Sequence, residues 1–221
     1  MKNVLLSCFT LLVAAVLSAC GGSRIGSTDK IPESGFLPNY KLLQPVQDMP
    51  QDVKLWRYRK AGLTPSEYTE VIVDPIYLNQ TEYSGAITPQ IVDETKAILD
   101  QTIRAAIENK GLKIVTQPGP KVVRVSLAIT GAEVTNDNLK VWNFTPIGLA
   151  TNAAAYAGGM NSKTPALVVE NKITDSQSKE FIGGGVVTVQ GESFRLESSS
   201  VKAFQDMAKR IVTLALEAPG K

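Results

Sequence analysis

An apolar run close to the N-terminus limits which part of this chain can belong to a folded domain. Lys2 supplies a short basic start, and residues 4–17 are mainly apolar over about 14 residues, fewer than the roughly 20 that a helix needs to cross a bilayer. Small residues then precede Cys20. This order is typical of a secretory signal peptide. We therefore expect residues 1–19 to be removed, which leaves about 200 residues to fold, near the size of one domain.

The residues around Cys20 carry a more specific signal. Leu17-Ser18-Ala19-Cys20 resembles the lipobox of bacterial lipoprotein signal peptides. The resemblance implies that Cys20 becomes the mature N-terminus and carries acyl chains such as palmitate. At about 0.8 kcal/mol per buried methylene group, several acyl chains hold a protein on a membrane effectively permanently. Gly21, rather than Asp, follows the cysteine, which implies transfer to the periplasmic side of the outer membrane of a Gram-negative bacterium.

Two residue counts limit the chemistry of the mature chain. The sequence contains no histidine and two cysteines, of which Cys8 leaves with the leader and Cys20 is committed to lipid. Disulfides, thiolate nucleophiles, cysteine or imidazole metal sites, and Ser-His-Asp or Cys-His catalysis are therefore not expected. The sequence predicts no cofactor and no metal site, and it argues against an enzyme. The net charge of +2 also gives no electrostatic case for nucleic-acid binding.

The mature chain is expected to contain one folded domain. Residues 20–33 are rich in Gly and Ser and predict a flexible tether behind the lipid. Aromatic and apolar residues return from Ser34 onward, and the sequence shows neither an internal repeat nor a second domain boundary. We therefore expect a single domain over residues 34–217, long enough to bury a core without disulfides.

Hydrophobic periodicity predicts two helices and several strands. Thr88 can cap a helix that starts at Pro89, and Gly111 lies where this helix ends. A second amphipathic helix is expected over residues 199–217. Strand-like runs occupy residues 55–59, 70–78, 112–116, 121–135, 166–174 and 181–190. This order predicts an α+β fold, a two-layer sandwich in which a mixed or antiparallel sheet has helices packed mainly on one face.

Three short motifs, taken together with the lipobox, resemble one known family. They are Ser34-Gly35-Phe36-Leu37, the strand from Tyr68 to Pro75 and the turn from Asp175 to Glu180. With them the chain is similar, over about residues 34–215, to bacterial lipoproteins known as domain of unknown function 3313. The resemblance implies an envelope location and an α/β sandwich, and it brings no activity and no functional residues. At the level of fold alone, the layout is also similar to small periplasmic lipoprotein domains that bind envelope assembly machines.

Two Ser-x-x-Lys pairs have the spacing that places a lysine amine one helical turn from a serine nucleophile. They are Ser176 with Lys179 and Ser199 with Lys202. The companion motifs of such enzymes are missing, because no Ser-Asp-Asn is present and Lys163-Thr164 is followed by proline instead of glycine. Ser199 is therefore interpreted as a helix N-cap, and Ser176 as a turn residue.

Acidic residues are the remaining candidates for acid–base chemistry. The candidates that could pair for hydrolysis of a cell-wall glycan are Asp74, Glu133, Glu170, Asp175 and Glu180. Their spacing assigns no pair. Asp175 and Glu180 flank a hairpin turn, where such residues commonly bond the backbone or face solvent. A hydrolase that uses carboxylates only thus stays an alternative without assigned residues.

Two further motifs have structural interpretations. Gly183-Gly184-Gly185 lies at the start of a strand rather than between a strand and a helix, so it predicts a bulge or a close approach of backbone instead of a phosphate-binding loop. The run from Trp56 to Lys60 mixes cations with aromatic residues. It could meet lipid headgroups or an anionic polymer, or it could be an ordinary strand with solvated basic tips.

The segment from Trp142 to residue 159 leaves two interpretations open. Trp142 and Phe144 precede a Thr-Pro helix start, and small or apolar residues then dominate. Ala150, Ala154 and Gly158 recur every four residues, a spacing that lets another helix approach closely. One interpretation is a short helix lying on the sheet. The other is an exposed surface that docks a protein partner or contacts the membrane.

These observations together predict a lipid-anchored domain that binds another envelope component and is not an enzyme. The alternatives are a cell-wall hydrolase that uses carboxylates only and a carrier of a hydrophobic small molecule, which would need a cavity. No motif defines the partner or the oligomeric state.

Overall fold

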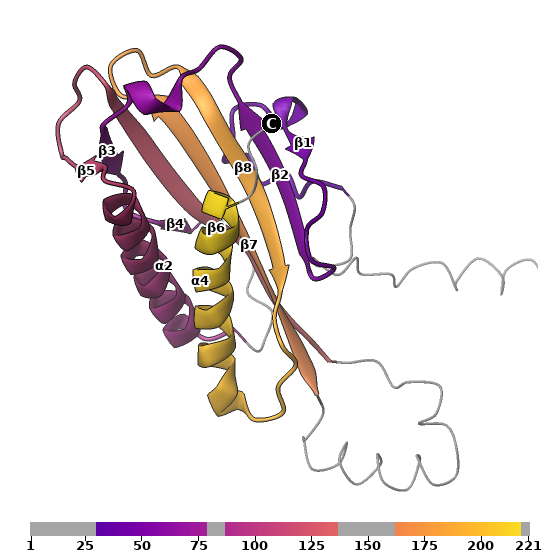
Figure 1. Ribbon diagram of the computed structural model, residues 1–221. Helices are drawn as coiled ribbons and strands as arrows, with labels where there is room; N and C mark the ends of the chain where they lie inside the picture. Colours follow the sequence, from indigo (N-terminus) through magenta and orange to yellow (C-terminus); the bar gives the residue numbers. More distant parts are fainter. Residues whose placement is uncertain (1–29, 79–86, 137–161, 218–221) are drawn as a thin grey trace, which may run out of the picture.

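The computed structural model describes residues 30–78, 87–136 and 162–217. These residues form an eight-stranded sheet that two helices cover on one face (Figure 1). The strands are β1 (Gln44–Pro45), β2 (Val53–Arg59), β3 (Glu70–Val73), β4 (Tyr77–Leu78), β5 (Lys113–Ile114), β6 (Val122–Asn136), β7 (Lys163–Asp175) and β8 (Phe181–Gln190). The helices are α2 (Pro89–Asn109) and α4 (Ser200–Glu217), and the 3-10 turns are η2 (Tyr40–Leu42), η3 (Pro65–Glu67) and η5 (Glu197–Ser199). The predicted α+β fold is confirmed.

The sheet is open and mixed, with the strand order β1-β2-β8-β7-β6-β3-β5 and with β4 paired to β6. Along the series β1, β2, β8, β7 and β6, each strand is antiparallel to the next. β3 and β4 run parallel to β6, and β3 also runs parallel to β5. In each parallel pair, one strand precedes α2 in the sequence and the other follows it. A parallel pair needs a long crossover connection, and this helix supplies it.

The first helix begins and ends where its capping residues predict. The Thr88 Oγ1 accepts a hydrogen bond from the backbone N–H of Ile91 at 3.3 Å, and Pro89 occupies the first turn. Gly111 follows the last turn with a φ of +74°, a backbone conformation that glycine adopts without strain. Neither helix in the described part of the chain is long and apolar enough to cross a membrane.

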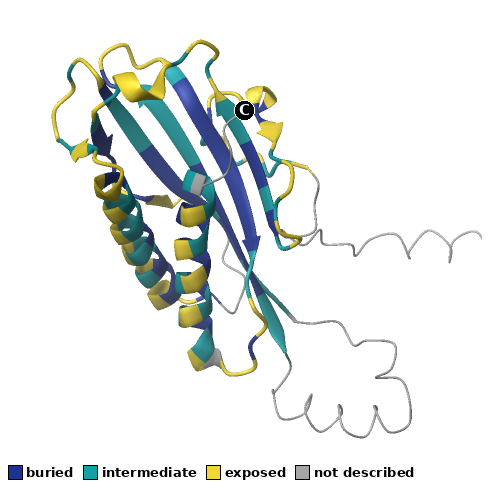
Figure 2. Cartoon of the chain, in the orientation of Figure 1, coloured by how far each residue is buried: buried dark blue, intermediate teal, exposed yellow. Residues whose placement is uncertain are grey.

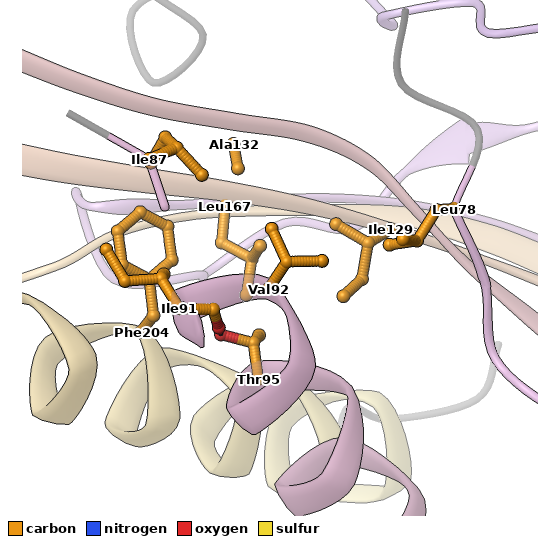
Figure 3. A pocket seen from close by; sticks show the side chains of 9 residues that line it. All are labelled: Leu78, Ile87, Ile91, Val92, Thr95, Ile129, Ala132, Leu167 and Phe204. Atoms are coloured by element: carbon orange, nitrogen blue, oxygen red, sulfur yellow. The ribbon is translucent and has the colours of Figure 1, made fainter. Parts of the chain in front are cut away.

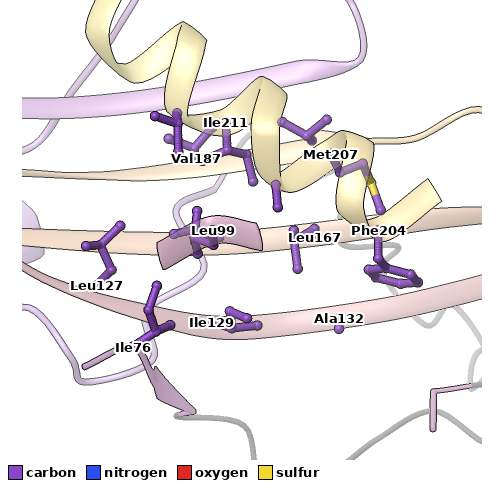
Figure 4. Packing of buried hydrophobic residues seen from close by; sticks show 14 of the residues in the cluster. Ile76, Leu99, Leu127, Ile129, Ala132, Leu167, Val187, Phe204, Met207 and Ile211 are labelled. Atoms are coloured by element: carbon purple, nitrogen blue, oxygen red, sulfur yellow. The ribbon is translucent and has the colours of Figure 1, made fainter. Parts of the chain in front are cut away.

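The main core lies between the helices and one face of the sheet, here called the helix face (Figure 4). Leu127, Leu167 and Val187 point into it from three neighbouring central strands. Leu99 of α2 and Phe204 of α4 meet them and are almost completely buried. In Figure 2 the buried colour follows the sides of both helices that face the sheet. The apolar side chains at alternate positions of these strands therefore determine which face of the sheet the helices cover.

The opposite face of the sheet, here called the outer face, is partly covered by residues 31–43, here called the strap. The buried strap residues are Leu37, Tyr40 and Leu43. They pack against strand side chains that alternate with the core residues, namely Trp56, Val168 and Val186. The sequence predicts helices mainly on one face, as found, but it does not predict that a largely irregular segment crosses the other.

The three glycines at the start of β8 allow the neighbouring strands to approach closely. A Cβ atom on Gly184 would lie 2.7 Å from the carbonyl oxygen of Asn171, and one on Gly185 would lie 2.7 Å from that of Trp56. The pairing of β7 with β8 also shifts register between Ile173 and the next residue. The predicted close approach and bulge are thus both present.

Candidate functional site

A fully buried carboxyl group joins the strap to the sheet. Glu170 lies on β7 and has no exposed surface. Its Oε2 accepts a hydrogen bond from the hydroxyl of Tyr40 at 2.7 Å, across 130 residues of sequence. Its Oε1 has no hydrogen-bond partner among the described residues. Burying a carboxyl group that is only partly hydrogen-bonded costs free energy, so a group of this kind calls for an explanation. We therefore take the contact between Tyr40 and Glu170 as the candidate site of the outer face.

The same tyrosine hydroxyl organises the strap itself. It accepts hydrogen bonds from the backbone N–H groups of Ser34 at 3.1 Å and Leu37 at 3.3 Å, and it lies 3.2 Å from the Ser34 Oγ. Gly35 adopts a φ of +85° within this loop, which explains a glycine there. The strap therefore folds around the atom that donates to Glu170.

A second contact holds the strap at Phe36. The Lys172 Nζ lies 4.8 Å from the centroid of the Phe36 ring, within the range of a cation–π interaction. The ring of Tyr77 lies 6.0 Å from the same ring, in a tilted arrangement. Lys172 and Glu170 occupy alternate positions of β7, so both strap contacts use the outer face of one strand.

A separate polar group on the outer face joins the end of β3 to β6. The Asp74 Oδ1 accepts a hydrogen bond from the Arg124 guanidinium at 2.8 Å, and its Oδ2 accepts one from the Ser126 hydroxyl at 2.7 Å. The backbone N–H of Asp74 also donates to the carbonyl of Val125. Both carboxylate oxygens are used, so Asp74 connects two strands in the structure.

The two carboxylates at the β7–β8 turn are also engaged. The Asp175 Oδ1 accepts hydrogen bonds from the backbone N–H groups of Ser178 at 2.8 Å and Gln177 at 3.1 Å. The bond from the Ser178 backbone is the main reason that the pKa of Asp175 is lowered. Glu180 accepts a hydrogen bond from the Lys60 ammonium at 2.5 Å, which raises the pKa of that lysine. Asp175 therefore bonds its own turn, as predicted, and the half-exposed Glu180 joins the end of the turn to Lys60.

The Ser-x-x-Lys pairs do not form a nucleophile with its base. The Ser176 hydroxyl is buried, donates to the Gly119 carbonyl at 3.1 Å and accepts from the Gly119 N–H at 3.2 Å. The Lys179 ammonium donates to the Ser176 backbone carbonyl rather than to the hydroxyl. In the second pair, Lys202 forms an ion pair with Asp206. The interpretation of Ser176 as a turn residue is confirmed.

The residues from Trp56 to Arg59 lie on β2, so the predicted strand is present, and contact with headgroups or an anionic polymer stays a hypothesis. Trp56 is buried beneath the strap, and Tyr58 stacks on Phe181 with 5.2 Å between ring centroids. Arg57 points the other way and donates to the carbonyl of Ala215 at 2.7 Å, near the C-terminus of α4. Burial lowers the pKa of Arg57. These side chains thus connect layers of the domain.

A small apolar cavity lies between α2, α4 and the helix face (Figure 3). Its lining includes Ile91, Leu167 and Phe204, and its volume is about 10 Å³. Such a volume holds about one water molecule and is far too small for a hydrophobic ligand. A larger hollow of about 420 Å³ is lined by one hairpin, residues 45–56. It lies along a single turn instead of between elements, so neither space supports a carrier.

The remaining predicted site residues lie outside the described residues. They are Cys20, proposed for lipidation, and the candidate docking residues Trp142, Phe144, Ala150, Ala154 and Gly158. Glu133 lies on β6 and has an interaction partner. In the part of the chain that the structure describes, no group of three or more acidic or cysteine side chains could hold a metal ion.

Sequence reasoning missed the contact between Tyr40 and Glu170. It names Glu170 only as one of five unassigned carboxylates, and it assigns Tyr40 no role. A usable signal was present, because Glu170 directly follows the apolar residues 166–169 of a strand. A charged residue at such a position is rarely buried without a partner.

The described residues combine an open α+β sheet with a strap on its outer face, and the sequence carries a stretch that resembles a lipoprotein leader. The model of the family described as "Protein of unknown function (DUF3313)" matches residues 32–217, and the chain belongs to this family. The chain is also 25% identical over 203 residues to the uncharacterized lipoprotein YdcL of Escherichia coli (strain K12). That match covers 91% of this chain and 89% of the relative. The family predicted from the motifs is thus confirmed, and the chain is a lipoprotein whose specific function is unknown.

Several solved structures are similar to this chain in arrangement. The PelC dodecamer from Paraburkholderia phytofirmans has 12% identity and a TM-score of 0.35, with 71% of this chain and 95% of that chain covered. Lipoprotein GNA1162 from Neisseria meningitidis has 10% identity and a TM-score of 0.38, with 67% and 98% covered. A minor lipoprotein from Acinetobacter baumannii has 11% identity and a TM-score of 0.35, with 67% and 92% covered. At these TM-scores no property of the three proteins is carried over.

Proposed function

We propose that this lipoprotein is a non-enzymatic domain that binds another envelope protein from the periplasmic side of the outer membrane, anchored there by acyl chains on Cys20. The relationship to a lipoprotein family supports the anchor, and the lipobox supports its position. The strap overlaps the end of the proposed tether at residues 31–33 and is bonded to the sheet through Tyr40. The anchor would therefore connect to the folded domain at the outer face.

The hydrogen bonding and burial of the candidate acidic residues are the observation that favours a binding domain over a hydrolase. Asp74 is bonded to Arg124 and Ser126, Glu180 is bonded to Lys60, and Asp175 bonds its own turn. Glu170 is completely buried. A glycosidase needs two carboxyl groups that face a substrate between them. These residues instead serve bonds that hold strands and turns together.

For the docking surface we propose the segment that carries Trp142, Phe144, Ala150, Ala154 and Gly158. Its composition supports this proposal, because small residues at intervals of four allow a partner helix to approach closely. A lysine at position 154 would place a charge and a long side chain in such a contact. The substitution Ala154→Lys should therefore prevent binding by a partner.

In-cell crosslinking of the full-length lipoprotein, followed by affinity capture and mass spectrometry, tests this proposal. Ala105→Lys is the matched control, because Ala105 is an exposed residue of α2. We expect one enriched envelope protein with the unmodified chain and with Ala105→Lys, and its loss with Ala154→Lys at an unchanged melting temperature. Capture that survives Ala154→Lys, or a chain that simply unfolds on this substitution, would remove the support for a docking surface.

Membrane fractionation tests the proposed location. Gly21→Asp changes the residue that follows the acylated cysteine and leaves the described fold untouched. We expect the unmodified lipoprotein to sediment with outer-membrane vesicles and the Gly21→Asp variant to shift to the inner-membrane fraction. Identical distributions of the two chains would contradict the assignment to the outer membrane.

The hydrolase alternative predicts released cell-wall fragments when the purified protein is incubated with isolated cell wall. Our proposal predicts that none are released. Release that disappears in Asp74→Asn or Asp175→Asn, with the fold intact, would favour the enzyme. Release that survives both changes, and a change of each remaining candidate carboxylate, would indicate a contaminant.

A further inference from the structure

The strap is attached to the sheet in a way that permits it to leave without opening the sheet. β2, β8 and β7 are bonded to one another through continuous backbone ladders. For residues 35–43, the described structure shows no backbone–backbone hydrogen bond to these three strands; the bond from the Leu43 N–H goes to Tyr40, within the strap. In the described structure residues 35–43 of the strap are thus attached to these strands through side chains, and their departure breaks no ladder.

The strap also has an internal framework that lets it move as one unit. The Tyr40 hydroxyl binds the backbone of Ser34 and Leu37, and the Asn39 side chain accepts from the Lys41 N–H at 3.0 Å. These bonds join residues within the strap and do not depend on the sheet. Segments with internal bonds and few bonds to the remainder of a protein open locally at a lower free energy than global unfolding.

The buried carboxyl group favours opening. Glu170 is enclosed with one oxygen unpartnered, and Thr188, nearly as buried on the neighbouring β8, also has an unpartnered hydroxyl. Thr188 pairs with Val168, next to Glu170 on the outer face, so both groups lie in the sheet region that the strap adjoins. Water would hydrate them once the strap leaves, and this gain offsets part of the apolar contact that is lost.

From these observations we propose that the strap is a latch: it opens as a unit on a folded sheet, and the bond from Tyr40 to Glu170 is the contact that closes it. Opening exposes the apolar strip that consists of Trp56, Val168 and Val186. Because the strap lies between the proposed lipid tether and β1, its opening would lengthen the free chain between the anchor and the sheet. The latch does not depend on the identity of any partner.

Two neighbouring residues of β8 provide a matched test. Val186 lies beneath the strap and Val187 lies beneath the helices, and each is almost fully buried. In the full-length lipoprotein, Val186→Cys and Val187→Cys would be treated with a thiol reagent under native conditions, and the parent chain gives the background. Latch opening predicts that position 186 reacts about tenfold faster or more, because only global unfolding exposes position 187.

A second substitution isolates the closing bond. Tyr40→Phe keeps the ring and removes the hydroxyl, so it destabilises the closed state and should accelerate labelling at position 186 by about tenfold. Leu43→Ala leaves the hydroxyl in place and should act in the same direction by weakening the apolar contact. Equal labelling of the two cysteines, or labelling at position 186 that Tyr40→Phe does not accelerate, would overturn the latch. Circular dichroism spectra of each variant establish that the sheet is folded.

Discussion

At positions 184 and 185 of β8, the place that a side chain would occupy is already filled by backbone. Gly185→Ala would bring a Cβ atom within 2.7 Å of the Trp56 carbonyl oxygen, so a strand would have to shift. We expect a loss of about 1–3 kcal/mol in the free energy of unfolding. Gly183→Ala is the control, because its nearest contact would be 3.4 Å, and urea denaturation should show a much smaller loss. Equal losses would contradict this account of the glycine triplet.

Ser176 tests whether a motif residue is structural or catalytic. Its hydroxyl both donates to and accepts from the backbone of Gly119, and the side chain is fully buried. Ser176→Ala leaves those two backbone groups without their partner, so the free energy of unfolding should fall by about 1–2 kcal/mol. Chemical denaturation measures this loss. An unchanged midpoint would mean that the bonds to Gly119 are not important for the turn.

The limits of sequence reasoning are clearest at the scale of single residues. The turn position of Ser176 and the close approach of backbone at the glycine triplet could be predicted, because local motifs determine both. The bond from Tyr40 to Glu170 could not, since the two residues are 130 positions apart and no periodicity relates them. The partners of Asp74 likewise come from β6, about 50 residues further along the chain.

At the scale of elements, α2 depends on its N-cap. Thr88→Ala removes the acceptor for the Ile91 N–H and should lower the free energy of unfolding by about 1 kcal/mol. Gln101→Ala, at an exposed position in the middle of the same helix, should be neutral or slightly stabilising. Thermal denaturation of both variants checks the difference. A Thr88→Ala variant as stable as Gln101→Ala would show that the cap contributes nothing.

The ion pair between Asp52 and Arg210 joins the segment before β2 to α4, and it predicts a pH dependence. The hydrogen bond from Arg210 lowers the pKa of Asp52 below its ordinary value of 3.8. The contribution of this pair is therefore fully present above pH 3.8 and is lost as the pH falls through the lowered pKa. Both side chains are more than a third exposed, so screening limits the contribution to about 0.5 kcal/mol.

Asp52→Asn provides the measurement. Urea denaturation should show the variant to be less stable than the unmodified chain at pH 7, with the difference shrinking toward pH 2. A difference that is the same at both pH values would mean that the pair does not titrate as described.

Elements with their own periodicity or caps were predicted well. α2, α4 and the long strands β6, β7 and β8 lie close to their expected positions. The two-residue strand β1 and the strap were not predicted, because neither carries a repeating pattern. Their places depend on the outer face of the sheet, and its side chains come from strands distant in the sequence. The helix face could be predicted from amphipathic helices, whereas the outer face required the assembled sheet.

At the scale of the whole molecule, the domain is a sheet with two differently covered faces, and we propose a lipid at its N-terminus. The helices hold one face through the main core, and the strap holds the other through a few side chains. An anchored chain of this design would receive any pull from the membrane first at the strap. The proposal that this domain binds another envelope protein while anchored in the outer membrane therefore depends on the lipid at Cys20.

Mass spectrometry of the mature N-terminal peptide, from full-length protein purified from the membranes of a Gram-negative host, tests that claim most directly. The account predicts a peptide that begins at Cys20 and carries a diacylglyceryl group and an amide-linked acyl chain, and it predicts that a Cys20→Ala chain leaves the membrane fraction without lipid. A mature chain that begins at another residue, or that begins at an unmodified Cys20, would contradict the account.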